Sequence, residues 1–120
     1  YLVPVPSRPG AASRRGGQHM LAVARHAAAA LARAGWAAAV APALRLDGRA
    51  RDSVGLDARA RAANLRGRLR HVMAGTPPPG QPVVLLDDVI TTGATAAACT
   101  MVLRAAGVTV AATLALTATD

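Results

Sequence analysis

The sequence predicts an α/β fold, a single domain over residues 1–120 in which a mostly parallel central sheet is flanked by helices. Short apolar runs alternate along the chain with longer Ala-rich segments, which is the order of elements in βαβ units. One of these runs, VVLL at residues 83–86, has the continuous apolar pattern of a strand covered on both faces. A chain of 120 residues with 52% hydrophobic content suits one compact core rather than two.

The first part of the chain predicts a strand, a helix and a second strand. Residues 2–5 are expected to form a short buried strand, and a loop rich in Ser, Arg, Pro and Gly follows through Gly17. A helix is expected over residues 18–34, closed by Gly35. Residues 36–46, rich in Ala and Val, are expected to form the next strand.

The middle of the chain carries weaker patterns. Residues 47–55 are polar, contain arginines and show no clear periodicity, so we expect a mobile segment there. Asp57 is a suitable N-cap for a short helix that reaches Leu65. The AGTPPPG run at residues 74–80 predicts a turn.

The last part predicts one complete βαβ unit over residues 83–116. The strand at 83–86 is followed by a helix over residues 94–106, with Gly107 as its C-cap, and by a strand over residues 108–116. Ligands of open parallel sheets bind outside the carboxyl ends of the strands. The residues that follow position 86 are therefore the first place to look for a site.

Composition excludes several kinds of protein. The net charge of +8 suggests a polyanion such as a nucleic acid as a partner. This suggestion is weak, because all the basic residues are arginine, as a coding bias would give, and only Tyr1 and Trp36 could stack on bases. Cys99 is the single cysteine, which excludes an internal disulfide and a cysteine metal cluster. No apolar stretch approaches the ~20 residues of a membrane helix, so we expect no membrane partner and a cytoplasmic location.

The loop after residue 86 carries the most specific chemistry. Asp87 and Asp88 are expected at the strand end, where two adjacent carboxylates need hydroxyl donors or a metal. The next residues offer hydroxyls, backbone amides and a helix dipole that suit a phosphate: Thr91, Thr92, Gly93, Ala94 and Thr95. A diol site beside a phosphate site fits a ribose 5-phosphate. The alternative is two solubilising carboxylates and an ordinary N-cap turn, although generic turns rarely carry both features in series.

The segment VVLLDDVITTGAT at residues 83–95 resembles the phosphoribosyl pyrophosphate (PRPP) motif of the type I phosphoribosyltransferases. The resemblance implies a Rossmann-like core in which Asp87 and Asp88 hold the ribose 2- and 3-hydroxyls and residues 91–95 wrap the 5-phosphate. It also implies Mg²⁺ as the cofactor. The ion would be bound with the pyrophosphate, and Asp87 and Asp88 would contact it through water.

Other segments resemble the ComF-type, competence-associated branch of that family: LVPVPSRP at 2–9, RRGGQ at 14–18 and VGLDARARAANLRG at 54–67. Gly17, Gln18 and His19 stand where the branch typically has Phe, Asn and Gln. Family members carry an N-terminal extension and a hood outside the core, and we expect this chain to be the PRPP domain without them.

Two further segments resemble parts of these enzymes that handle the leaving group. Pro6, Ser7 and Arg8 resemble the pyrophosphate loop, and the arginine-bearing segment with Arg49 and Arg51 takes the place of the flexible lid. The alternative for both is solvated arginines on surface loops.

The resemblance implies transfer of a phosphoribosyl group from PRPP to an acceptor, with release of pyrophosphate. The acceptor, a nucleobase or another nucleophile, is left open, because Thr91 stands where purine-salvage relatives have an acidic residue. The alternative is a catalytically silent module that binds PRPP or a nucleotide and acts with a DNA-handling protein. The assembly that we expect is a homodimer.

Overall fold

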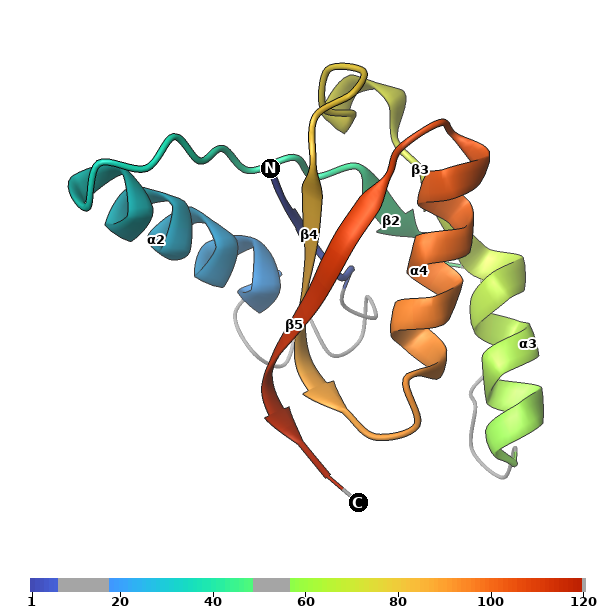
Figure 1. The fold of residues 1–120 in the computed structure, drawn as a ribbon. Coiled ribbons are helices and arrows are strands. Elements are labelled where there is room, and N and C mark those ends of the chain that lie inside the picture. The colour runs from blue at the N-terminus through green and yellow to red at the C-terminus, as the bar shows by residue number, and fades with distance from the viewer. Residues whose placement is uncertain (7–17, 49–56, 120) are drawn as a thin grey trace.

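A parallel three-stranded sheet forms the centre of the molecule (Figure 1). The computed structural model describes residues 1–6, 18–48 and 57–119. In these ranges β4 (Val83–Ile90) is the middle strand, and β1 (Leu2–Pro4) and β5 (Val110–Ala118) pair with it on its two sides. The predicted α/β fold with a parallel sheet flanked by helices is confirmed at this level.

Helices cover both faces of the sheet (Figure 1). The helix α2 (His19–Arg33) packs on one face, and α4 (Ala94–Ala105) packs on the other, with α3 (Ala58–Arg68) against its outer side. Side chains alternate between the faces of a strand. Leu85 accordingly belongs to the core beneath α4, whereas Leu86 belongs to the smaller core beneath α2. The prediction that this strand is covered on both faces is therefore confirmed.

Residues 36–46 do not form the single strand that the sequence predicted. Within them Val40 makes one isolated parallel bridge with Leu2, and only β2 (Leu44–Leu46) is a strand. Pro42 lies between these two pieces, and a proline has no N–H to donate to a ladder. β2 then pairs antiparallel with β3 (Leu69–His71), and the short 3₁₀ helix η1 (Met73–Gly75) follows.

The helix ends follow the capping residues. Asp57 accepts a hydrogen bond from the amide of Ala60 at 2.7 Å, as predicted for an N-cap, although α3 continues three residues beyond Leu65. Gly35 and Gly107 take positive φ angles of +87° and +79° after α2 and α4. The βαβ unit of β4, α4 and β5 is parallel, as expected from its sequence.

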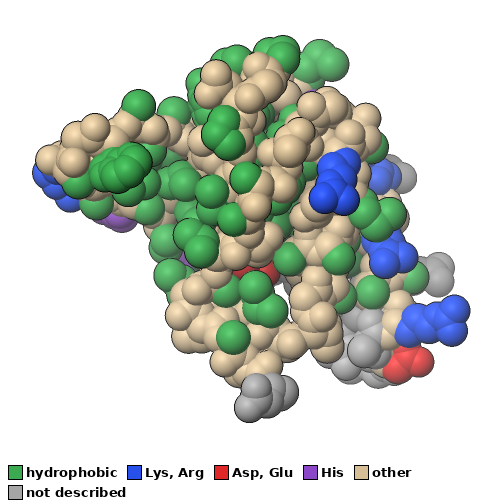
Figure 2. Space-filling view, viewed as in Figure 1, with side chains coloured by type: hydrophobic (Ala, Val, Ile, Leu, Met, Phe, Trp, Pro, Cys, Tyr) green, Lys and Arg blue, Asp and Glu red, His purple; other side chains and the backbone are tan. Residues whose placement is uncertain are grey.

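One part of the sheet carries uncovered apolar side chains. Leu114 and Leu116 on β5 are 58% and 65% exposed. Leu114 pairs in register with Leu86, so the side chains of Leu86 and Leu114 belong to the face on which α2 packs. The main contacts of α2 are with β1 and β4. Figure 2 shows apolar side chains spread over α2 and β5, and arginine side chains gathered over α3 and α4. No described helix is both long enough and apolar enough to span a bilayer.

Candidate functional site

The paired carboxylates lie inside β4, not after its end as the sequence predicted. β4 continues to Ile90 because β5 stays paired with it, whereas its pairing with β1 ends near Leu86. The apolar run stops at Leu86, but the strand continues, and Asp87 is still buried. Asp87 and Asp88 therefore sit on rigid backbone just beyond the carboxyl end of β1, which is the edge where parallel sheets bind ligands.

The two carboxylates have different surroundings. Asp87 is 6% exposed, and its Oδ1 accepts a hydrogen bond from the amide of Asp88 at 2.9 Å. The side chain of Asp88 is 37% exposed, and its Oδ1 accepts from the amide of Val89 at 2.8 Å. The backbone at Asp88 is held from β5, since the Thr117 hydroxyl donates to its carbonyl at 3.2 Å. Asp88 is thus the more accessible of the pair to a ligand.

The same surroundings move the two pKa values in opposite directions. Burial raises the pKa of Asp87 above its ordinary value of 3.8, against the hydrogen bond from the Asp88 amide, and the neighbouring Asp88 carboxylate adds to the rise. Burial also acts to raise the pKa of Asp88, but hydrogen bonds from His19 and from the Val89 amide outweigh it, so that pKa is lowered. Asp88 is therefore the carboxylate that stays ionised most readily.

His19 belongs to this cluster, although its sequence context gave little sign of it. It is the first residue of α2, and its Nε2 lies 3.1 Å from Oδ2 of Asp88. Buried Met20 and Ala24 anchor the start of α2 on the sheet against Leu86. The only signal in the sequence was the position of His19 at the predicted helix start; its partner is 69 residues away.

The loop after β4 leads directly into α4, as predicted. Gly93 is the N-cap of α4 and has a positive φ of +77°, in the left-handed region that favours glycine. The Thr92 hydroxyl accepts a hydrogen bond from the amide of Ala94 at 3.4 Å, and the first turn of α4 holds no acidic residue. Thr91 and Thr92 are exposed, while Ala94 and Thr95 are half-buried. α4 thus begins six residues after Asp88, and its first amides and its dipole follow the carboxylates in a continuous strand, loop and helix.

The first strand brings one more predicted residue to the same edge. The amide of Val5 donates to the carbonyl of Leu86 at 2.8 Å, so Pro6 follows directly after the carboxyl end of β1. Its predicted neighbours in the pyrophosphate loop, Ser7 and Arg8, lie outside the described residues, as do the lid residues Arg49 and Arg51. Their roles stay predictions.

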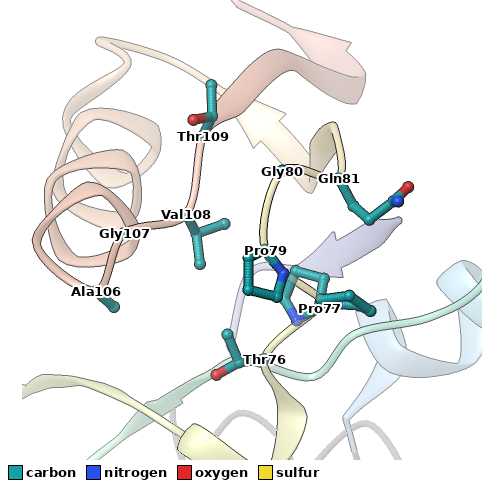
Figure 3. A pocket seen from close by; sticks show the side chains of 10 residues that line it. Thr76, Pro77, Pro79, Gly80, Gln81, Ala106, Gly107, Val108 and Thr109 are labelled. Atoms are coloured by element: carbon teal, nitrogen blue, oxygen red, sulfur yellow. The ribbon is translucent and has the colours of Figure 1, made fainter.

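Two hollows in the described surface lie away from the carboxylates. The pocket in Figure 3 is lined by residues 76–81 and 106–109, which precede β4 and β5 and so lie at the amino ends of these strands. The other is bordered by Asp47, Gly48, Gly67, Arg68 and Arg70. There Arg68 donates twice to the carbonyl of Asp47, and Arg70 and Arg45 pair with the Asp47 carboxylate at 3.1 and 3.5 Å.

Over the part of the chain that the structure describes, no three His, Cys, Asp or Glu side chains are grouped to hold a metal ion. A cation at the carboxylates would thus draw further ligands from water or from a bound phosphate. Comparison of the chain with protein-family models and with curated proteins found no match. The case for a function therefore rests on the residues and on their geometry.

Proposed function

We propose that the chain is a phosphoribosyltransferase that binds PRPP at the carboxyl edge of β1 and β4. One observation carries the proposal: the segment with the PRPP-like sequence folds as a strand, a tight loop and a helix. In that order it places a half-exposed, ionised carboxylate, a glycine with positive φ and a helix start with no acidic residue in its first turn. These are groups that suit a diol and a phosphate on one sugar.

The proposed roles of the described residues are positional. Asp88 accepts hydrogen bonds from the ribose hydroxyls, and Asp87 supports it by holding its amide. Amides of residues 92–95, with the helix dipole, hold the 5-phosphate. Held at both places, the ribose can react at carbon 1: the bond to pyrophosphate breaks, a bond to the acceptor forms, and the charge of the oxocarbenium-like transition state is stabilised electrostatically.

The donor set fits Mg²⁺ that arrives with the ligand. Mg²⁺ is usually bound by one or two carboxylates together with substrate phosphates, and Asp88 offers one accessible ionised carboxylate. When bound, the ion would neutralise negative charge on the leaving pyrophosphate.

The test is a calorimetric titration of the protein with PRPP and Mg²⁺. Asp88→Asn should weaken binding roughly ten- to a hundredfold, since a lost charge-assisted hydrogen bond is worth about 1.5 to 3 kcal/mol. Asp57→Asn is the matched control: it makes the same change of charge on α3, and asparagine still caps a helix. Wild-type protein that does not bind PRPP, or equal affinities for both variants, would contradict the proposal.

A second assay separates the enzyme from the silent PRPP-binding module. Release of pyrophosphate is followed with PRPP, Mg²⁺ and a panel of nucleobases. Release that depends on one base identifies the acceptor. Tight binding of PRPP without release favours the module, for which the arginines over α3 and α4 offer a surface for an anionic partner (Figure 2).

A further inference from the structure

His19 joins two elements that are distant in sequence at the point where the ligand is proposed to bind. Its Nε2 is 3.1 Å from Oδ2 of Asp88, and the two side chains are 29% and 37% exposed. An ionised carboxylate only accepts hydrogen bonds, so the proton of this contact resides on Nε2. The contact is therefore a charge-assisted hydrogen bond from α2 to β4 at a partly open surface.

The geometry points to His19 as a positioning residue that orients the Asp88 carboxylate toward a vicinal diol, an inference that rests on the proposed PRPP site. Both oxygens of Asp88 accept hydrogen bonds from the protein, Oδ1 from the Val89 amide and Oδ2 from His19. Two donors on two different oxygens fix the rotation of the carboxylate. A carboxylate has about four lone-pair positions, more than these two donors occupy.

The backbone that carries Asp88 is fixed independently of His19. Asp87 accepts from the amide of Asp88, and Thr117 donates to its carbonyl. Removal of the imidazole should therefore leave the strand in place and release only the side chain of Asp88. Orienting a carboxylate before the ligand arrives removes part of the entropy that binding would otherwise lose. The predicted effect is on recognition of the diol, because the phosphate is held at a different place, the start of α4.

The probes are ribose 5-phosphate, 2-deoxyribose 5-phosphate and inorganic phosphate, which separate the diol from the phosphate. The wild type should prefer the ribose compound over the deoxy compound by about tenfold or more, the worth of one charge-assisted hydrogen bond. His19→Ala should reduce this preference to about a fewfold, and leave the affinity for inorganic phosphate unchanged. His26→Ala is the matched control, because His26 is exposed on the same helix.

Rescue separates positioning from simple packing. Glutamine carries its amide nitrogen at the reach of Nε2, whereas asparagine reaches only as far as Nδ1. His19→Gln should therefore keep the diol preference, and His19→Asn should lose it, at melting temperatures close to that of the wild type. An unchanged preference in His19→Ala would overturn the role of His19 while the PRPP site stood. If the wild type binds neither PRPP nor ribose 5-phosphate, both the proposed site and this role of His19 are wrong.

Discussion

Gly93 and Gly107 lie at the two ends of α4 with nearly identical backbone angles, which makes them a matched pair for testing the phosphate site. Their φ angles are +77° and +79°, and a Cβ built at either residue would meet nothing within 4 Å. Alanine at either position therefore meets no steric obstacle, and each substitution carries only the cost of the left-handed conformation, about 1 kcal/mol. For a chain of this length, both variants should melt about 4 °C lower than the wild type.

The two variants should differ in binding. Gly93 lies at the start of α4, where the 5-phosphate is proposed to approach the backbone, so a methyl group there would stand in the path of the anion. Gly107 lies at the other end of the helix. We expect Gly93→Ala to weaken the binding of PRPP roughly tenfold, equivalent to about 1.4 kcal/mol, and Gly107→Ala to leave it unchanged. The measurement is a melting curve and a PRPP titration for each variant, and equal affinities would refute the proposed approach of the phosphate at Gly93.

Three further predictions concern the stability and reactivity of the empty protein. The pKa of Asp87 is raised, so the folded protein keeps a proton that the unfolded chain loses, and the contribution of Asp87 to stability falls as pH rises above 3.8. The pKa of Asp88 is lowered, so Asp88 contributes stability above pH 3.8, and this stability is lost as pH falls. Near neutral pH Asp87→Asn should thus raise the melting temperature and Asp88→Asn lower it, and the reverse order would show that the two environments are misassigned. Cys99 is buried and its pKa is raised to about 12, so a thiol reagent at about pH 8 should modify it only on unfolding, and immediate labelling of folded protein would contradict its burial. A Cβ at Gly75 would overlap the carbonyl oxygen of Pro42, so Gly75→Ala should lower the free energy of unfolding by about 2 kcal/mol or more. Gly67 lies in open space on α3, so Gly67→Ala should be neutral or stabilising. Comparable melting curves for the two variants would count against this packing of Gly75.

The elements that local signals define were predicted best. The cap at Asp57 and the helix stops at Gly35 and Gly107 depend on residues adjacent in sequence. The strand at 36–46 was predicted wrongly, because its Ala and Val content outweighed Pro42 in the interpretation. The bounds and pairing of β3 were not predicted, because its three residues, Leu-Arg-His, carry no strand pattern of their own and pair with the distant β2.

The candidate site, too, was predictable from the sequence only in part. The sequence by itself determined which residues are present in the segment 83–95, the order of carboxylates, hydroxyls and glycine within it, and the helix that follows, since these depend on local propensity and spacing. Only the tertiary structure decided that Asp87 and Asp88 lie within a strand, because the pairing with β5 extends β4. It also decided that Asp87 is buried and Asp88 half-exposed, and that His19 contacts Asp88. Burial, pKa and contact between residues 69 apart arise from the packing of helices on the sheet, and a local pattern contains no information about which distant residue will fill that place.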